Sequence, residues 1–316
     1  MSAATEKEEG ENDNKMMRCA SCGIAEGDGD ISLKKCTACH LVKYCGVKCQ
    51  RDHWPKHKKE CKKRAAELRD EILFKQPESS HLGDCPICCL PLADDTQWAK
   101  NILMACCGKT ICCGCYYANL KRERTGRLEH KCPFCRHPLP KSGEDPRICY
   151  MKRVKANDPE ALCHMGNDLC KEGDYAGGLN YFSKAAELGD ARAHFNLSQM
   201  YYDGLGVERD EKKQLYHLER AAIGGHSMAR HNLGCMEERH GNMDRAIKHW
   251  IIAANLAYEL SLEALQNAYR KGLVSKEVFS SALRGYQAAI EATKSPQREE
   301  GAEFKKFLAT EFGWTG

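Results

Sequence analysis

The sequence contains no long apolar run. Residues 1–15 are acidic and polar and lack the apolar stretch that a secretory signal peptide requires. No later stretch of the 316 residues is long and apolar enough to span a bilayer. We therefore expect a protein that is not secreted, has no membrane partner and is located in the cytoplasm, the nucleus or both.

A catalytic constellation is also missing from the sequence. There is no nucleophile beside a base, no phosphate-binding loop and no pair of carboxylates in a defined setting. The segment Gly204-x-Gly206 has no strand pattern before it and no third glycine, so it indicates a turn rather than a dinucleotide loop. Any chemistry is therefore expected to proceed through a bound partner.

Cysteine, in contrast, is abundant and clustered. Of the 21 cysteines, 17 lie between Cys19 and Cys135, which requires a local cause. In a reducing compartment zinc is favoured over disulfides, because two cysteines separated by two residues present both thiolates to one tetrahedral ion. The other four fall in a helical C-terminal half and are expected to fill its core. They are Cys149, Cys163, Cys170 and Cys235.

The formal net charge of +4 counts every cysteine as neutral. Zinc ligation removes the thiol proton, and fifteen thiolates in four zinc sites would bring the folded chain to about −3. Residues 34–69 contain twelve Lys or Arg against three acidic residues. We interpret this basic stretch as a solvated face that offsets thiolate-rich zinc sites, and a phosphate-binding face is the alternative. Nucleic acid is therefore not an expected partner.

The first cysteine-rich block supplies eight candidate metal ligands in four close pairs. They are Cys19 and Cys22, Cys36 and Cys39, Cys45 and Cys49, and His57 and Cys61. Together with Tyr44-Cys45, Cys49-Gln50 and Trp54-Pro55-Lys56-His57-Lys58, their order resembles a MYND zinc finger. That family interleaves its two sites. The resemblance implies that one zinc is bound by Cys19, Cys22, Cys45 and Cys49, and the other by Cys36, Cys39, His57 and Cys61.

MYND fingers generally bind short proline-containing peptides, so the resemblance also implies a peptide groove. The matching positions in this chain are Gln50 and Trp54. An amide can hydrogen-bond to a peptide backbone, and an indole can pack on proline. The alternative is that Trp54 packs inside the small core of the finger. His40 and His53 are interpreted as side chains that bind no metal.

The second cysteine-rich block, residues 85–135, also has four close pairs. They are Cys85-Pro-Ile-Cys88, Cys106-Cys107, Cys112-Cys-Gly-Cys115 and Cys132-Pro-Phe-Cys135. This order resembles a RING finger, in which the first and third pairs hold one zinc and the second and fourth pairs hold the other. The resemblance implies one site at Cys85, Cys88, Cys112 and Cys115, and a second site at Cys106, Cys107, Cys132 and Cys135.

The RING resemblance has one departure. Lys109 occupies the position where most RING fingers have a histidine, and a charged lysine cannot bind zinc, so we interpret an all-cysteine variant. Because Cys106 and Cys107 are adjacent, the alternative is that only one of them binds. The leftover Cys89 and Cys113 are interpreted as small hydrophobic residues. Since four protein ligands close every site, we expect structural zinc, about four ions per chain.

Many RING fingers are ubiquitin ligases, which hold a ubiquitin-charged conjugating enzyme in a reactive orientation. The positions that match the enzyme-binding surface are Ile87 and Pro133, and Arg136 matches the basic residue that ties the enzyme to ubiquitin. The apolar residue usual a few positions after Cys115 has only approximate candidates, Tyr117 and Leu120. The implied partner is a ubiquitin-conjugating enzyme.

After residue 158 the pattern becomes helical and repeats. Motifs that begin near Leu162, His194, Arg230 and Glu263 recur at intervals of about 32 to 36 residues. Second helices are predicted at residues 174–188, 210–223, 242–256 and 275–292, most of them opening on a capping Asp, Asn or Ser.

The run from Asn196-Leu197 to Val207, followed by Ala221-Ala222, is similar to a Sel1-like repeat. The resemblance implies a solenoid whose concave face binds a protein partner. Three histidines in the repeats are interpreted as packing or exposed residues rather than metal ligands. They are His194, His217 and His231.

We therefore predict a multidomain protein with two small zinc-stabilised modules, MYND and RING, followed by an all-α Sel1-like helical-repeat solenoid. The predicted parts are a disordered tail at 1–18, the MYND finger at 19–61, a helix and linker at 62–84, the RING finger at 85–135, a linker at 136–157, the repeats at 158–294, and a C-terminal tail or capping helix at 295–316. Two functions fit this organisation. One is a RING-type ubiquitin ligase that recruits partners through the other modules, and the other is a non-catalytic, zinc-dependent interaction scaffold.

Overall fold

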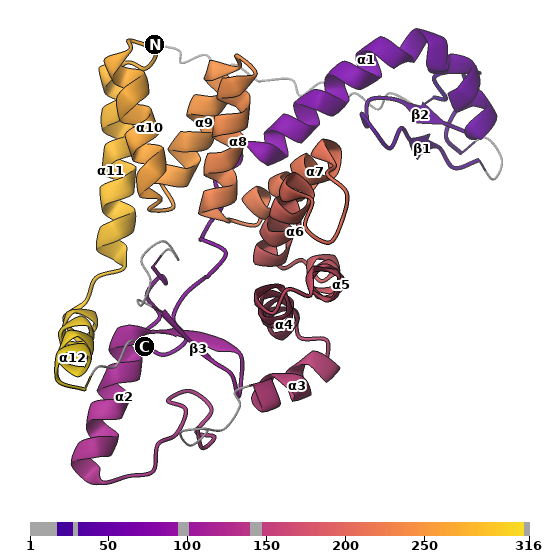
Figure 1. Cartoon of the computed structure of the whole chain (residues 1–316). Helices are drawn as coiled ribbons and strands as arrows, with labels where there is room; N and C mark the ends of the chain where they lie inside the picture. The colour runs from indigo at the N-terminus through magenta and orange to yellow at the C-terminus, as the bar shows by residue number, and fades with distance from the viewer. Residues whose placement is uncertain (1–17, 28–30, 94–100, 140–146, 313–316) are drawn as a thin grey trace, which may run out of the picture. The chain divides into compact units, whose positions relative to one another are not determined.

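The computed structural model describes residues 18–27, 31–93, 101–139 and 147–312 (Figure 1). Most of the predicted tail at 1–18, and part of the linker predicted at 136–157, lie outside the described residues. The chain divides into two compact units, Met1–Ile72 and Leu73–Gly316. Among the described residues, no helix is both long and apolar enough to cross a membrane.

The first unit is a small module built on a short hairpin and the start of a long helix. Strands β1 (Lys34–Lys35) and β2 (Lys43–Tyr44) pair in antiparallel fashion, and helix α1 (Val47–Leu73) follows. Beyond the finger, α1 is rich in Lys, Arg, Glu, Ala and Leu, which are strong helix formers. The buried core consists of four cysteines with Leu33 and Tyr44. Such a core is typical of domains that need a metal to fold.

The second cysteine-rich module belongs to the second unit and is built on a hairpin and a helix. Strand β3 (Asn101–Met104) pairs in antiparallel fashion with β4 (Lys109–Cys112). Gly108 ends the tight connection with a φ of 69°, which glycine adopts without steric cost. Helix α2 (Cys113–Gly126) starts directly after β4, so strand and helix bring neighbouring cysteines to one place.

Helix α3 (Arg147–Lys155) lies within the segment that the sequence predicts to be a linker. Val154 packs against the core of the first repeat, and the ring of Tyr150 stacks on His164 with centroids 5.7 Å apart. Both contacts are made with residues outside α3, and the basic sequence of α3 gives no helical period by itself. The linker prediction is therefore corrected to a helix for residues 147–155.

The next part of the chain is a series of helical hairpins. Their helices are α4 (Pro159–Lys171), α5 (Tyr175–Glu187), α6 (Ala191–Asp203), α7 (Glu211–Ile223), α8 (Ser227–Arg239), α9 (Met243–Ala254), α10 (Glu259–Arg270) and α11 (Lys276–Ala292). The second helix of each hairpin begins one residue after the predicted cap. The side chains of Asp174, Asp210 and Ser275 each accept the backbone N–H three residues further on.

Small residues allow the helices of these hairpins to approach closely. Ala185, Ala221 and Ala253 have no exposed surface. A methyl group at Gly166 in α4 would overlap the ring of Phe182 in α5. The alanine and glycine positions of the repeats therefore determine how near neighbouring helices lie, and larger side chains there would separate them.

Residues 73–82, part of the predicted linker at 62–84, pack against the repeats, and we call this segment the strap. Leu73 is 1% exposed and shares a core cluster with residues of α7 and α8. The guanidinium of the fully buried Arg230 donates to the carbonyl oxygen of Leu73. The ring of Phe74 lies 4.7 Å from that of His249 in α9. The strap is therefore part of the repeat core and not a free linker.

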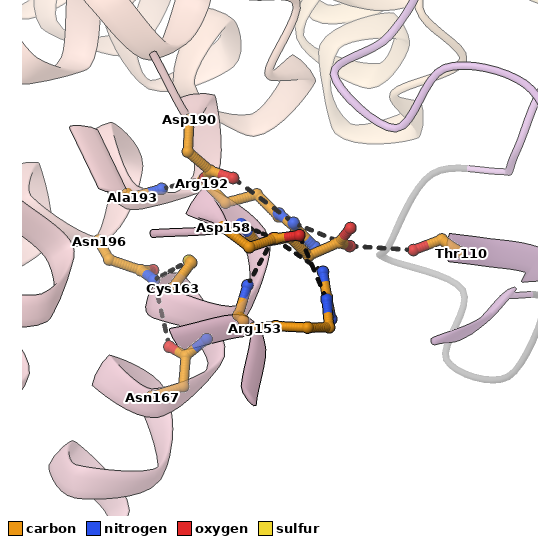
Figure 2. Close-up of polar contacts among 11 residues, drawn as sticks. Thr110, Arg153, Asp158, Cys163, Asn167, Asp190, Arg192, Ala193 and Asn196 are labelled. Atoms are coloured by element: carbon orange, nitrogen blue, oxygen red, sulfur yellow. Dashed lines mark hydrogen bonds and ion pairs between the residues drawn. The ribbon is translucent and has the colours of Figure 1, made fainter. Parts of the chain in front are cut away.

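Polar contacts tie β4 to the first repeats, as Figure 2 shows. Thr110 donates its hydroxyl to the Glu160 carboxylate at 3.2 Å, and Arg192 pairs with the same carboxylate at 3.1 Å. Arg153 in α3 pairs with Asp158 at 2.8 Å. These contacts attach the hairpin of the second cysteine-rich module to α4 and α6.

The C-terminal helix α12 (Pro296–Phe312) packs against α2 (Figure 1). The ring of Phe304 meets Tyr117 edge to face, with centroids 5.8 Å apart. The segment predicted as a tail or capping helix at 295–316 thus contains a helix, but that helix covers the cysteine-rich module. Residues 313–316 lie outside the described residues.

Candidate zinc sites and partner surfaces

The described residues contain four groups of four metal-binding atoms, and the atoms of each group lie within 4.8 Å of one another. The groups are Cys19, Cys22, Cys45 and Cys49; Cys36, Cys39, His57 and Cys61; Cys85, Cys88, Cys112 and Cys115; and Cys106, Cys107, Cys132 and Cys135. These are the four groups that the two resemblances imply. Each module therefore interleaves its pairs, with ligands that are distant in sequence meeting at one point.

The distances within the groups fit tetrahedral zinc. Four sulfurs at about 2.3 Å from one zinc ion lie about 3.8 Å apart along the edges of the tetrahedron. The Sγ atoms of Cys88 and Cys112 are 3.8 Å apart, and those of Cys22 and Cys45 are 3.6 Å apart. In the second cluster of the second module, Cys107 Sγ lies 3.8 Å from Cys132 Sγ. The clusters are therefore consistent with bound zinc.

One backbone turn recurs at four of the cysteine pairs. The residue after the second cysteine has a left-handed φ, and its N–H donates to the carbonyl oxygen of the first cysteine at 2.8–3.0 Å. The residues with this conformation are Gly23, His40, Cys89 and Arg136, with φ of 77°, 58°, 54° and 62°. A left-handed φ is unfavourable for the three that are not glycine. The turn is therefore held by its surroundings, and it directs both sulfurs toward one ion.

Cys106 and Cys107 come from a different turn, the connection between β3 and β4. The N–H groups of Cys107 and Gly108 both donate to the carbonyl oxygen of Met104, at 3.2 and 2.7 Å. Cys106 Sγ lies 3.4 Å from Cys135 Sγ, so both sulfurs of the adjacent pair reach the cluster. Lys109 is exposed, in agreement with its interpretation as a residue that does not bind the metal.

The three histidines of the first module have different surroundings. His57 is 2% exposed and its Nε2 lies 3.2 Å from Cys39 Sγ, so it belongs to a ligand group. His53 places Nδ1 3.1 Å from the hydroxyl of Tyr44, which attaches α1 to the end of β2. His40 is exposed at a turn.

The candidate peptide residues of the first module lie on α1. Gln50 is half-buried, and Trp54 follows one helical turn later with 40% of its surface exposed. The Trp54 ring meets His57 edge-on, with centroids 6.5 Å apart. This exposure is larger than a core residue would have, so it favours a surface role over packing inside the finger. A ligand bound at Trp54 would therefore lie near His57, which belongs to one of the candidate metal groups.

The candidate enzyme-binding residues of the second module are at the surface. Ile87 is 40% exposed, Pro133 is half-buried and Arg136 is exposed. The Arg136 guanidinium donates to the Asn119 side-chain oxygen at 3.4 Å. Asn119 lies four residues after Cys115 in α2, and the sequence pattern did not single it out because a polar residue stands where an apolar one was sought.

A buried carboxylate joins α2 to the last cysteine pair. Glu123 is 3% exposed and accepts hydrogen bonds from Asn119 at 2.8 Å, from His130 at 2.7 Å and from the N–H of Lys131 at 3.1 Å. Burial by itself would raise the pKa of Glu123, but the hydrogen bonds from His130, the backbone and Asn119 outweigh it and lower the pKa. Glu123 therefore stays charged and holds α2 beside Cys132. Sequence reasoning missed it because nothing in the sequence marks a buried Glu.

Four further residues of the second module clarify the sequence interpretation. Tyr117 is 3% exposed, so it is not a surface residue, and Leu120 is half-buried. Cys113 is buried, as a small hydrophobic residue would be. Cys89 is exposed at its left-handed turn, so its interpretation as a small packing residue is wrong.

Three histidines of the repeats, His194, His217 and His231, each contact a neighbouring polar side chain. His194 and His217 lie with their Nδ1 atoms 2.9 Å apart, and His231 Nδ1 lies 2.8 Å from the Ser261 hydroxyl. Burial lowers the pKa of all three histidines. In the described part of the chain none of them belongs to a group of three or more metal-binding atoms.

The repeats also contain a pocket of about 330 Å³ between α6, α7 and α8. Among its lining residues are Tyr202, Gln214, Met236 and two arginines, Arg209 and Arg239. A pocket with aromatic, apolar and basic groups can bind a peptide side chain.

Family models match two parts of the chain. The MYND finger model matches residues 19–61, and the Sel1 repeat model matches 159–190, 191–226 and 227–258. A RING finger is not matched in residues 85–135. The chain thus contains a MYND finger followed by an all-helical Sel1 repeat solenoid, and a fourth hairpin, α10 with α11, follows the matched repeats. This combination is typical of zinc-binding proteins that mediate protein–protein interactions.

Similar proteins share parts of the chain. DAP3-binding cell death enhancer 1 of Mus musculus is 26% identical over 175 residues, which cover 43% of this chain and 34% of that protein. Chitin synthase regulatory factor 4 of Schizosaccharomyces pombe is 30% identical over 88 residues, covering 28% of this chain and 14% of that protein. The chain thus spans about a third or less of these curated relatives. The crystal structure of a Sel1 repeat protein from Oxalobacter formigenes matches with a TM-score of 0.40 and 26% identity, covering 47% of this chain and 64% of that one.

Proposed function

We propose that residues 85–135 form a RING-type zinc finger and that the protein is a ubiquitin ligase. The observation that carries this proposal is the interleaving of two four-cysteine groups across a hairpin and a helix. In this arrangement the first and third pairs share one ion and the second and fourth pairs share the other, the order that the RING resemblance implies. Zinc at these groups would be structural, since four protein ligands leave no position for water.

The surface around the first and last cysteine pairs supports binding of a conjugating enzyme. Ile87 and Pro133 are accessible beside ligands of different ions, and Arg136 is exposed next to the last ligand. The buried Glu123 connects α2 to the segment that precedes Cys132. A RING finger accelerates ubiquitin transfer by holding its partner in one orientation, so rigid attachment of these loops suits the task.

The second candidate function is a non-catalytic scaffold. Two observations favour it: Asn119 replaces the apolar residue expected in α2, and Tyr117 is covered by Phe304 of α12. Each of these two features, the polar residue at 119 and the covered Tyr117, reduces the apolar surface that a conjugating enzyme could use. In this case the zinc sites would only maintain the fold of the module.

A ubiquitin assay distinguishes the two functions. The purified zinc-loaded chain, incubated with activating enzyme, ubiquitin and a panel of conjugating enzymes, is expected to form ubiquitin chains. Arg136→Ala should slow chain formation with unchanged zinc content. Arg127→Ala is the matched control, because Arg127 is also exposed in this module and also has a left-handed φ, 50° against 62°. If no enzyme of the panel supports chains, the ligase proposal is wrong. If both variants are equally slow, Arg136 has no specific role in chain formation.

Recruitment of partners would fall to the other modules. The exposed Trp54 with Gln50 supports binding of a proline-containing peptide at the MYND finger. The pocket beside Tyr202 supports binding of a protein partner at the repeats. The name of the mouse relative describes a protein that binds another protein, which agrees with such a role. We further propose about four zinc ions per chain, a location in the cytoplasm or nucleus, and no nucleic-acid or membrane partner.

A further inference from the structure

Helix α12 is fitted closely to α2 although about 180 residues separate the two helices in sequence. A methyl group at Gly114 in α2 would overlap the backbone of Arg298, and one at Gly301 in α12 would overlap the backbone of Gly114. The two helices therefore approach at backbone distance, and glycine on both sides permits this approach. Phe304 adds an apolar contact with Tyr117.

This approach places the side chain of Arg298 at the first cysteine pair of the module. One guanidinium nitrogen, Nη1, donates to the carbonyl oxygens of Pro91 and Thr293, both at 2.7 Å. The other, Nη2, donates to the carbonyl oxygen of Leu90 at 3.0 Å and to Cys88 Sγ at 3.4 Å. One arginine of α12 thus binds both a candidate zinc ligand and the turn that carries it.

The Leu90 carbonyl that Arg298 contacts is part of the same cysteine turn. It also accepts the N–H of Cys85 at 2.9 Å. Arg298 therefore holds the turn from the outside, while the N–H of Cys89 closes it from the inside through the Cys85 carbonyl at 2.8 Å. Loss of the guanidinium would remove a side-chain contact that fixes both Cys88 Sγ and its turn.

Charge gives Arg298 a second role. Four thiolates around a divalent zinc ion carry a net charge of about −2, and hydrogen bonds or cations at the sulfurs reduce the cost of burying that charge. Backbone N–H groups of Cys112 and Cys115 donate to sulfurs of this group, both at 3.4 Å. Among the hydrogen bonds that the described residues donate to these sulfurs, the one from Arg298 comes from a charged group.

Among the described residues, no lysine or arginine donates a hydrogen bond to a sulfur of the second cysteine group of the module. The guanidinium of Arg153 lies against Gly108, where a methyl group would overlap it. Its charge, however, is paired with Asp158 through two hydrogen bonds at 2.8 and 3.2 Å. Arg298 is therefore expected to affect zinc binding at only one of the two groups. The other group serves as an internal reference when zinc release is measured.

We propose that Arg298 is a positioning residue for zinc at Cys85, Cys88, Cys112 and Cys115, so that the C-terminal helix stabilises a metal site that is distant in sequence. The proposal rests on zinc binding by the proposed RING-type finger and is independent of ligase activity.

The test compares zinc release from full-length, zinc-loaded variants in excess chelator with a colorimetric readout. Arg298→Gln should release one zinc ion per chain about tenfold faster than the parent, because loss of an outer hydrogen-bond partner weakens metal sites 10- to 100-fold. The other ions should leave at the parental rate. Arg298→Lys, which retains the charge but not the fork of donors, should restore part of the difference.

Two variants separate the sulfur contact from packing of α12. Arg124→Gln removes another cation of the interface, one that lies 6.0 Å from the centre of the Phe304 ring and touches no sulfur, and it should release zinc like the parent. Phe304→Ala loosens α12 without changing Arg298. With cobalt in place of zinc, Arg298→Gln should also shift the sulfur-to-metal absorption bands, which a change in packing alone would leave in place.

Each outcome is decisive. Equal release from Arg298→Gln and the parent would overturn the proposal, as would faster release of every ion. A Phe304→Ala variant that releases zinc as fast as Arg298→Gln, with unshifted cobalt bands in both, would assign the effect to packing. Native mass spectrometry of the parent separates this failure from failure of the finger itself, since it shows whether the parent chain carries all four zinc ions.

Discussion

Replacing Leu73 with alanine should destabilise the repeats, although Leu73 lies about 85 residues before the first of them. Its side chain is 1% exposed and packs with Leu218 and Leu233 in the core between α7 and α8. A buried Leu→Ala change costs about 2–5 kcal/mol, from lost apolar transfer and from the cavity that remains. The backbone carbonyl that accepts from Arg230 is retained, so we expect a loss of about 3 kcal/mol rather than collapse of the segment.

The neighbouring residue provides the matched control. Ile72 has a side chain of similar size and is 58% exposed, so Ile72→Ala should change stability by less than about 0.5 kcal/mol. Urea unfolding of the zinc-loaded chain, followed by circular dichroism, measures the difference between the two variants. Hydrogen exchange of peptides from α7 and α8 then locates the loss, because amides near a destabilised core open more often. If Leu73→Ala matches Ile72→Ala in both measurements, the strap is not part of the repeat core.

Two further predictions concern the MYND finger and the response to acid. Trp54→Ala should reduce the affinity for a proline-containing peptide about thirtyfold while both MYND zinc ions remain. The affinity is measured by titration of the peptide and should not depend on salt concentration. Reversing the charges of Lys58, Lys59, Lys62 and Lys63 should have much less effect on peptide binding. Strong, salt-dependent binding of RNA or DNA that is lost with these lysines would instead indicate a nucleic-acid partner. Burial lowers the pKa of His217 to about 4. The unfolded chain therefore binds a proton below about pH 6.5 that the folded chain does not bind until about pH 4. The free energy of unfolding is unaffected by this group above about pH 6.5 and falls by up to about 1.4 kcal/mol per pH unit as the pH drops toward 4. His217→Gln should therefore flatten the fall in urea midpoint between pH 7 and pH 5, and an unchanged slope would contradict a neutral buried imidazole.

Local signals allowed much of the repeat region to be predicted. The helices after Asp174, Asp210 and Ser275 begin where predicted, because a capping side chain and the N–H groups that it binds lie within one turn of sequence. The same holds for the cysteine pairs, whose turns are closed by bonds between neighbouring residues. Local chemistry is visible in a sequence because both partners of each contact are close together.

Contacts between distant segments could not be predicted in this way. Arg298 and Cys88 are 210 residues apart, and the sequence around Arg298 is an ordinary charged helix. Glu123 was unremarkable for the same reason, since its burial depends on His130 and Lys131 folding over α2. In each case the partner decides whether a charged residue is solvated or structural, and a single sequence does not identify that partner.

The burial of Arg230 indicates that the strap and the repeats belong to one folding unit. Arg230 has no exposed surface, and its guanidinium donates to the carbonyl oxygens of Leu73 and Ala222. A fragment that starts at residue 158 would lack the first of these acceptors and leave a buried donor of Arg230 unpaired, at a cost of about 1–3 kcal/mol. It would also remove Leu73 from the core of α7 and α8. In sequence, the second cysteine-rich module therefore lies between the strap and the repeats, which pack on each other. Helix α12, near the C-terminus, packs against helix α2 of the same module.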